Sequence, residues 1–267
     1  MNVYVRTDLE GASGLWRGSQ VAPLPNQAGD YAYGRRCLAW DVNQVVDAAF
    51  EGGARRVVVA DCHGPGGLDW DQVDPRAALE KPGGLAAHKY PSFADGFDCV
   101  LDVGRHAMAG TRNAFLEHTQ SSRNWFEFRI NGRPQGELGI FAAYAGGFGV
   151  PIALVTGDRA ACAEAADLLP YVVTAEVKYA MRRQRGVHCY PRADVQTRLR
   201  EATAAALQRT AAGEAKPWRP DTPLELELTL QRTDLGDDME TRAPAWQRVS
   251  GRTFRRRIDD PKEIYCW

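Results

Sequence analysis

The sequence predicts an α/β fold: a three-layer core with a largely parallel sheet, followed by a smaller C-terminal α+β portion. Short apolar runs rich in Val, Ile and Leu alternate with longer segments of helical periodicity. Such alternation is typical of a parallel sheet that helices cover on both faces. The 267 residues are enough to bury a sizeable core. We expect residues 1–190 to form the α/β catalytic part and residues 191–267 to form a helix-plus-strands part that packs on it.

Apolar runs indicate the strands of the first part, and we expect them over residues 2–7, 55–60, 99–103, 125–130, 151–156 and 172–177. Helices are expected over residues 33–50, 137–145 and 159–168. The first of these helices has apolar residues about every 3.6 positions, and Gly52 and Gly53 end it. Asp158 stands at the N-cap position of the third helix.

The pattern changes after Pro191. Residues 193–211 form an alanine-rich segment that predicts a helix, and a proline-rich linker follows. Residues 224–230 alternate strictly between leucine and polar residues, which predicts a strand with one buried face. The tail over residues 249–258 can add another strand.

Composition excludes several classes of protein. Lys plus Arg total 33 against 34 for Asp plus Glu, so we expect no nucleic-acid partner. The basic run over residues 252–257 is interpreted as an exposed strand or a subunit contact. No apolar run approaches the ~20 residues that span a bilayer, and the start of the chain lacks the pattern of a secretory signal. We therefore expect a cytoplasmic protein with no membrane partner, in which the six scattered cysteines are reduced thiols.

An acidic turn follows the first expected strand. Asp8 and Glu10 are two residues apart, so on an extended segment their side chains point the same way. Carboxylates at the carboxyl end of a strand are well placed to hold a metal ion in an α/β fold. A solvated acidic turn is the alternative.

Histidines also lie near strand ends. His63 and His106 each follow an apolar run, and His118 lies in the next loop, over residues 112–123. Parallel strands bring their carboxyl ends to the same edge of a sheet, where these side chains can meet the acidic turn. Imidazole and carboxylate ligands together suit zinc, manganese or iron better than calcium or magnesium. His88 and His188 match no motif and are interpreted as structural.

Six short segments match one known family in the same order: Asp8-Leu9-Glu10-Gly11, Asp61-Cys62-His63, Gly104-Arg105-His106-Ala107, the stretch from Asn131 to Gly139, Val155-Thr156-Gly157-Asp158, and Val177-Lys178. In these segments the chain resembles the zinc D-aminopeptidases of the DppA-like family. The resemblance covers roughly residues 1–190, and the remainder aligns only loosely.

The resemblance implies a site that holds two zinc ions per chain, or manganese or iron in their place. The implied ligands are Asp8, Glu10, His63, His106 and Glu137. Asp8 would bridge the ions, and His118 would stand beside them as the catalytic histidine. Glu137 has another explanation, since an acid in the first turn of a helix is favoured by the helix dipole without any metal. The resemblance also implies a homo-oligomer of stacked rings, such as a decamer.

The chain departs from the family pattern at several positions. Arg6 replaces a small polar residue, Cys62 replaces a serine, and residues 15–30 differ from the family's usual loop. This loop follows the acidic turn and can reshape the substrate pocket. Cys62 could act as a nucleophile only with a histidine nearby to raise its thiolate fraction. Lys178 could bind a substrate carboxylate or pair with an acid.

These observations favour a metal-dependent aminopeptidase or amidase that hydrolyses small peptides or amides with a free N-terminus. The resemblance implies a preference for an N-terminal D-residue. The altered loop leaves open a dinuclear metallo-amidase that acts on a non-peptide amide. A metallophosphoesterase fits less well, because such sites recruit more Asp, Asn and His than this chain supplies in motif order. A peptide-binding protein of a transporter would be exported, and no export signal is evident.

Overall fold

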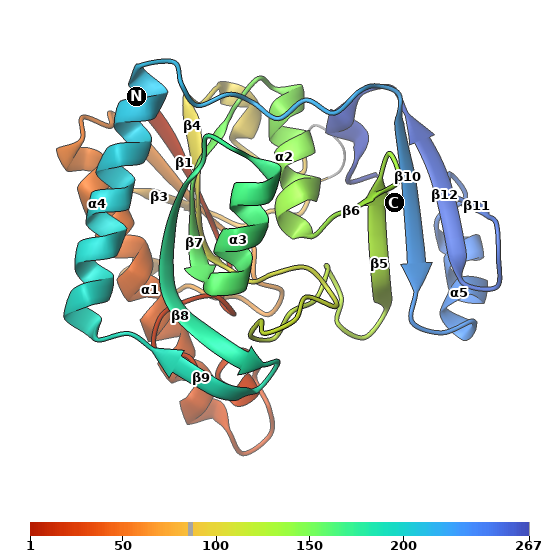
Figure 1. Cartoon of the computed structure of the whole chain (residues 1–267), viewed down its shortest axis with the longest axis horizontal. Helices are drawn as coiled ribbons and strands as arrows, with labels where there is room; N and C mark the ends of the chain where they lie inside the picture. The colour runs from red at the N-terminus through yellow and green to blue at the C-terminus, as the bar shows by residue number, and fades with distance from the viewer. Residues whose placement is uncertain (85–87, 267) are drawn as a thin grey trace.

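The computed structural model describes residues 1–84 and 88–266. Within them, seven strands form a sheet in the order β3-β2-β1-β4-β7-β8-β9, and only the pairing of β8 with β9 is antiparallel (Figure 1). The strands are β1 (Asn2–Thr7), β2 (Arg56–Asp61), β3 (Ala78–Glu80), β4 (Cys99–Arg105), β7 (Ile152–Asp158), β8 (Val173–Arg182) and β9 (Arg185–Cys189). The predicted α/β class with a largely parallel sheet is confirmed.

Helices cover both faces of this sheet, as Figure 1 shows. On one face, α1 (Ala28–Glu51) and α4 (Arg192–Ala211) pack against each other and against the sheet. On the other face lie α2 (Glu137–Gly147) and α3 (Arg159–Leu168). The helix α1 begins earlier than we predicted, because its exposed first turn carries no apolar signal. Among the described residues, none of the helices combines the length and apolar character needed to cross a bilayer.

A second, antiparallel sheet lies beyond α2 (Figure 1). Its order is β11-β12-β10-β5-β6, and a short helix α5 (Asp234–Arg242) accompanies it. Its strands are β5 (Trp125–Ile130), β6 (Arg133–Pro134), β10 (Leu224–Leu230), β11 (Gln247–Arg248) and β12 (Thr253–Ile258). The leucines of β10 are buried as predicted.

The placement of β5 corrects one expectation. We predicted this strand as part of the parallel sheet, but it pairs antiparallel with β10 and β6. Phe128 and Ile130 are buried, whereas the residues between and before them are exposed or half-buried. This alternation is typical of an antiparallel strand with one solvated face, while the central parallel strands are buried on both faces. The division of the chain near residue 190 stays a prediction.

The helix α2 joins the two sheets. Leu138, Ile140, Phe141 and Tyr144 are fully buried and belong to a core cluster that also contains side chains of both sheets. Burying one such side chain stabilises a fold by about 1.5–3 kcal/mol. The start of α2, where Glu137 lies, is thereby fixed between the sheets.

A buried lysine and a buried aspartate hold the acidic loop after β1. Lys178, on β8, is fully buried, and its Nζ donates to the carbonyl oxygens of Glu10 at 2.6 Å and Ala12 at 2.8 Å. Asp41, on α1, accepts hydrogen bonds from the backbone N–H and the hydroxyl of Ser13 at 2.7 and 2.5 Å. Lys178 therefore binds backbone carbonyls, which is neither of the two roles that we left open for it.

Burial raises the pKa of Asp41 to about 6, so this group favours folding when it is protonated. Its contribution is fully present below its unfolded pKa near 4 and is lost as the pH rises through about 6. We predict that the unfolding free energy of Asp41→Asn, compared with that of the native chain, increases by on the order of 2–3 kcal/mol as the pH rises through this window. Denaturant unfolding of both chains between pH 4 and pH 7.5 measures this difference. A difference that does not change with pH would contradict the prediction.

Candidate metal centre

The candidate site lies where the strand order of the parallel sheet reverses. The strand β1 pairs with β2 on one side and with β4 on the other, and the remaining strands add outward. In open α/β sheets, ligands bind in the crevice at the carboxyl ends of two such strands. Asp8 directly follows β1, His106 directly follows β4, and His63 comes two residues after β2. The structure thus brings the acidic turn and both strand-end histidines to one edge.

Two glycines let the ends of β1 and β4 approach each other. The N–H of Asp8 donates to the carbonyl of Val103 at 2.9 Å, and the N–H of Gly11 donates to the carbonyl of Gly104 at 2.8 Å. A Cβ on Gly104 would lie 2.1 Å from the carbonyl oxygen of Asp8. A Cβ on Gly11 would lie equally close, at 2.1 Å, to the carbonyl oxygen of Arg105. Any larger residue would push the two strand ends apart.

Glu137 reaches the crevice from the first turn of α2. Its Oε1 accepts the N–H of Gln120 at 2.9 Å and lies 3.3 Å from Nε2 of His106. The same nitrogen lies 3.2 Å from Oδ2 of Asp8. Two ligand atoms bound tetrahedrally to one zinc ion are separated by about 3.3 Å. The spacing of these three side chains therefore matches a metal site.

The ring of His106 is oriented by its backbone. Its Nδ1 lies 2.9 Å from the carbonyl oxygen of Ala107, and a carbonyl oxygen only accepts, so Nδ1 carries the hydrogen. In the neutral ring, Nε2 then presents a lone pair to the carboxylates of Asp8 and Glu137. This nitrogen is buried and makes no hydrogen bond within the described residues. Three electron-rich atoms facing one another require a proton or a metal cation between them, so the donor set fits a cation.

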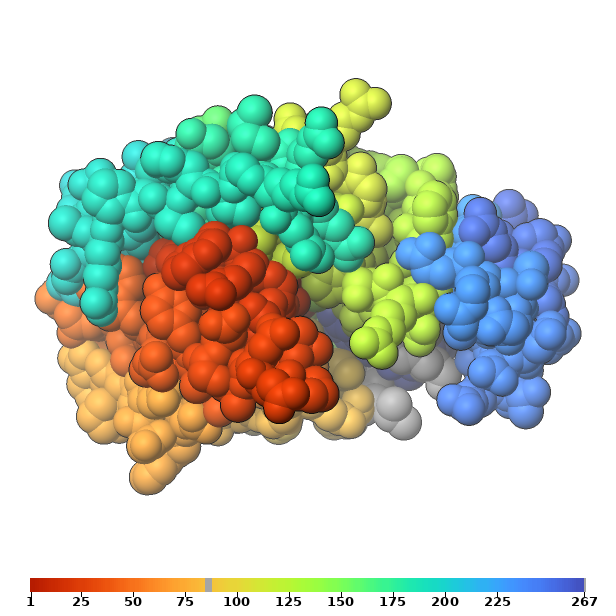
Figure 2. Space-filling view, turned by 90° about the horizontal axis from the view of Figure 1, so that it is seen from below, coloured from red at the N-terminus to blue at the C-terminus, as the bar shows by residue number. Residues whose placement is uncertain are grey.

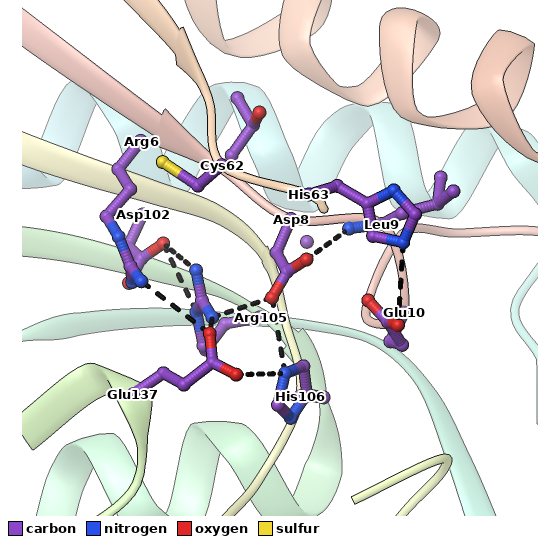
Figure 3. Close-up of polar contacts among 12 residues, drawn as sticks. Arg6, Asp8, Leu9, Glu10, Cys62, His63, Asp102, Arg105, His106 and Glu137 are labelled. Atoms are coloured by element: carbon purple, nitrogen blue, oxygen red, sulfur yellow. Dashed lines mark hydrogen bonds and ion pairs between the residues drawn. The ribbon is translucent and has the colours of Figure 1, made fainter. Parts of the chain in front are cut away.

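Asp8, His106 and Glu137 form a first group of candidate ligands, and Glu10 and His63 form a second group beside it (Figure 3). Both are buried, and Nε2 of His63 lies 3.7 Å from Oε1 of Glu10. In the described part of the chain, Oε2 of Glu10 has no hydrogen-bond partner. Asp8, Glu10 and His106 offer ligand atoms that all lie within 4.8 Å of one another. Asp8 therefore lies between the two groups, where a bridging ligand would be.

Opposite charges dominate the electrostatics of the crevice. Burial disfavours the carboxylate form of Asp8 and Glu137, but the guanidinium of Arg105 and the ring of His106 outweigh it. They hold the pKa of Asp8 and of Glu137 well below the usual range. Burial also disfavours the charged histidines, yet Glu137 raises the pKa of His106 and Glu10 raises the pKa of His63. The crevice thus favours positive charge between its carboxylates.

A buried arginine lies within this cluster and was not assigned a role from the sequence. Nη1 of Arg105 donates to Asp8 Oδ2 at 2.7 Å and to Glu137 Oε2 at 3.0 Å, and its Nη2 donates to Asp102 at 3.2 Å (Figure 3). Arg6 donates to the other oxygen of Asp102 at 3.0 Å. The signal in the sequence is the position of Arg105 directly before His106. Its guanidinium forms ion pairs with the carboxylates of Asp8 and Glu137.

His118 lies against the same cluster. Its ring stacks on that of His106, with centroids 3.9 Å apart and planes at 12°. Nδ1 lies 2.9 Å from the carbonyl oxygen of Leu116, and Nε2 lies 3.7 Å from Oε1 of Glu137. The side chain is 17% exposed, more than any of the proposed ligands. His106, His118 and Glu137 also offer ligand atoms within 4.8 Å of one another, so the geometry admits His118 either as a ligand or beside the metal.

Two cavities open onto His118. One of about 520 Å³ has aromatic walls that include Trp125 and Phe126, and one of about 510 Å³ includes Glu10 and Leu24. Figure 2 looks onto this face, where the surface is hollowed between the red N-terminal segment and the yellow-green segment. A small substrate can therefore reach the cluster from solvent.

The remaining candidates stay outside the cluster. Burial raises the pKa of Cys62 to about 11, which disfavours the thiolate that a nucleophile needs. His188 stacks on Tyr179 across β8 and β9, with centroids 4.9 Å apart, and His88 is exposed. All six cysteines are unpaired in the part of the chain that the structure describes.

We predict that Arg105→Met lowers the unfolding free energy by about 3–5 kcal/mol in the presence of a chelator, because it leaves buried carboxylates uncompensated. Added Zn²⁺ should restore part of this loss, since a dication can neutralise Asp8 and Glu137. Denaturant unfolding with and without Zn²⁺ measures both effects. Arg133→Met, which removes an exposed pair with Asp167, is the matched control and should change stability by less than about 1 kcal/mol. Equal losses in the two variants would contradict the prediction.

Comparisons with known proteins agree with this geometry. The family model described as D-aminopeptidase matches residues 1–267. A D-aminopeptidase from Bacillus subtilis strain 168 is 34% identical over 226 residues, which cover 84% of this chain and 80% of that protein. The solved structure of the "Zn-dependent D-aminopeptidase DppA from Bacillus subtilis, a self-compartmentalizing protease" superposes with a TM-score of 0.85 at 30% identity, covering 99% of this chain and 94% of that one. The chain therefore belongs to the D-aminopeptidase family and is a peptidase.

Proposed function

We propose that this protein removes the N-terminal residue, with a preference for D-residues, from small peptides, and that it does so with two zinc ions per chain. One observation carries the proposal: Nε2 of His106 lies between the carboxylates of Asp8 and Glu137, at 3.2 and 3.3 Å from their oxygens, inside a buried crevice. Zinc is the metal named for the structural relative DppA. Manganese or iron would suit the same donors.

The proposed ligands are those of the two groups described above. Asp8 and His106 with Glu137 would hold one ion, and Asp8 with Glu10 and His63 would hold the other. Asp8 is the bridge in this proposal, because its carboxylate lies between the groups. Zinc bound there would polarise the scissile carbonyl and lower the pKa of coordinated water.

His118 is the catalytic residue in this proposal. Its Nδ1–H donates to the carbonyl of Leu116, so the neutral ring presents the lone pair of Nε2 toward the cluster. A ring in this state can accept a proton and return it to the leaving amine. Oε2 of Glu10, which has no hydrogen-bond partner within the described residues, is a candidate acceptor for the free ammonium of the substrate.

A metallo-amidase that acts on a non-peptide amide is the second candidate. The loop over residues 15–30, which departs from the family pattern, supplies Val21, Ala22 and Leu24 to the cavity that includes Glu10 and His118. This loop would therefore contact the acyl side of a substrate. Its different side chains favour a shifted substrate range while leaving the metal cluster intact.

We further propose that the chain assembles into a homo-oligomer in the cytoplasm. DppA is described as self-compartmentalizing. Large apolar side chains that are exposed in the single chain, such as Trp70, Phe126 and Met181, are candidates for contacts between copies. A closed assembly would admit short peptides and exclude folded chains.

The decisive experiment is hydrolysis of a panel of substrates by the zinc-loaded protein. We expect D-aminoacyl amides and dipeptides to be cleaved faster than their L counterparts, and N-acetylated versions to be resistant. Elemental analysis should find about two zinc ions per chain, and a chelator should abolish the activity. Cleavage of simple non-peptide amides alone would support the second candidate. Absence of metal together with activity that a chelator leaves unchanged would overturn both.

We predict that His118→Ala lowers kcat by ~10²–10⁴, or roughly 3–5 kcal/mol of barrier, because the variant loses a proton donor beside the reacting bond. Both zinc ions and the melting temperature should be retained, since the ring is proposed to stand beside the ions. Metal content, melting temperature and turnover are measured on the same preparation. Loss of metal would make His118 a ligand, and near-native turnover would remove it from catalysis.

A further inference from the structure

A cavity of about 370 Å³ lies where α1, the start of α4 and the loop after β1 meet. Three of its lining residues, Tyr33, Arg36 and Trp40, belong to α1. Tyr190 and Arg192 line it from the junction of β9 with α4, and Ser13 lines it from the loop. We call it the α1–α4 cavity. None of the proposed metal ligands lines it, nor does His118, so it is distinct from the cavities that open onto the metal centre.

Aromatic rings form much of the wall of the α1–α4 cavity. Tyr33, Trp40 and Tyr190 are each half-buried, so part of each side chain remains accessible. The hydroxyl of Tyr190 donates to Glu176, which holds the ring in place. Ligand pockets are typically lined by aromatic and apolar side chains, and their volumes begin at about 300 Å³. The α1–α4 cavity therefore has room for a small ligand with one flat ring.

Two guanidinium groups stand among these rings. Cζ of Arg192 lies 4.5 Å from the centroid of the Trp40 ring, and Cζ of Arg36 lies 5.9 Å from that of Tyr33. Both arginines are exposed, and neither guanidinium forms an ion pair within the part of the chain that the structure describes. A guanidinium that lies over an aromatic ring keeps its N–H donors available for a carboxylate, which it can bind through two parallel hydrogen bonds.

The described residues that line the α1–α4 cavity include no acid. The fully buried Asp41 uses its two oxygens to accept the N–H and the hydroxyl of Ser13, at 2.7 and 2.5 Å. Glu176 pairs with Arg159 at 2.9 Å. Burial raises the pKa of the Cys37 thiol, which keeps this lining group uncharged. The walls thus carry positive charge without an acid to neutralise it, and such a site attracts an anion.

We propose that the α1–α4 cavity is a second ligand site, and that it binds an aromatic carboxylate with one ring, a short acid chain and no amino group. The ring would lie against Trp40 and its aromatic neighbours, and the carboxylate would accept hydrogen bonds from Arg192 and Arg36. An amino acid fits less well, because its ammonium would lie beside two guanidinium groups with no acid on the walls to accept it. The preference is therefore opposite to that of the metal centre, whose carboxylates favour positive charge.

The α1–α4 cavity shares a wall with the segment that carries Glu10. Ser13 and Gly14 line the cavity and belong to the loop after β1. A Cβ on Gly14 would lie 3.2 Å from Sγ of Cys37, so this part of the loop packs directly against α1. A ligand in the cavity would contact the loop as well as both helices. Because these segments meet only in the folded chain, such a ligand should raise the melting temperature.

The test is calorimetric titration of the zinc-loaded protein with three compounds of similar size. They are 3-phenylpropanoate, its neutral counterpart 3-phenylpropan-1-ol, and L-phenylalanine, which adds an ammonium. We expect 3-phenylpropanoate to bind at least tenfold more tightly than either of the others, the effect of one charge-assisted hydrogen bond. It should also raise the melting temperature and change the tryptophan fluorescence, and Trp40→Phe should remove the fluorescence change.

Variants of one arginine locate the carboxylate. Arg192→Met should weaken the binding of 3-phenylpropanoate about tenfold or more, and Arg192→Lys, which keeps the charge and loses the planar fork, should weaken it by a smaller factor. Arg209→Met is the matched control. It removes an exposed arginine of the same helix that lies outside the α1–α4 cavity, and it should leave the affinity at its native value.

Three outcomes would overturn this inference. Equal affinities for the three compounds would show that the α1–α4 cavity does not select an anion. Binding of 3-phenylpropanoate that Arg192→Met leaves unchanged would place the carboxylate elsewhere, for example on the metal ions. Absence of binding would also overturn it, as expected if another copy of the chain covers the cavity in an oligomer. None of these outcomes bears on the proposed peptidase function.

Discussion

The burial of several carboxylates in one crevice depends on the arginines that lie among them. Asp8 directly follows β1, Asp102 lies on β4 and Glu137 begins α2, and Arg105 contacts all of them. An unpaired charge in such a place costs several kcal/mol, so the pairing decides whether these segments can meet at all. A metal ion at the site would add positive charge to carboxylates that Arg105 and Arg6 already partly neutralise. The arginines therefore hold these carboxylates in place without a bound metal ion.

The backbone around the crevice is held equally tightly. Lys178 reaches from β8 to the loop after β1, and Gly104 lets the end of β4 lie directly against that loop. The side chains of the proposed ligands thus start from strand ends and a helix start that are packed on both sides. Sites on rigid elements keep their geometry within the narrow limits that catalysis needs. Lys178 also donates to the carbonyl oxygen of Leu15 at 3.3 Å, but most residues from 16 to 30 are exposed or half-buried, which allows them to vary without disturbing the cluster.

Local patterns predicted much of this arrangement. The spacing of two between Asp8 and Glu10 and the strand-end positions of His63 and His106 follow from strand periodicity and parallel topology alone. Glu137 needed the family resemblance, because a helix start explains an acid there without a metal. The sheet to which β5 belongs was wrongly predicted, although Glu127 and Arg129 alternate with Phe128 and Ile130, a pattern typical of an antiparallel strand with one solvated face. Arg105 was missed because its burial depends on tertiary partners that sequence periodicity does not reveal.

The hairpin of β5 and β6 lies in the chain between the loop of His118 and the helix that begins at Glu137. It pairs with β10, which belongs to the last third of the chain, while α4 returns to cover the parallel sheet. The chain thus crosses between its two sheets more than once, and both sheets support the candidate metal centre. Replacing the antiparallel sheet as a unit, by recombination or engineering, would therefore also change the segments that position His118 and Glu137. Sequence differences between proteins with this fold are expected to accumulate in the loops around the crevice, whereas the order of the strands in both sheets is expected to stay the same.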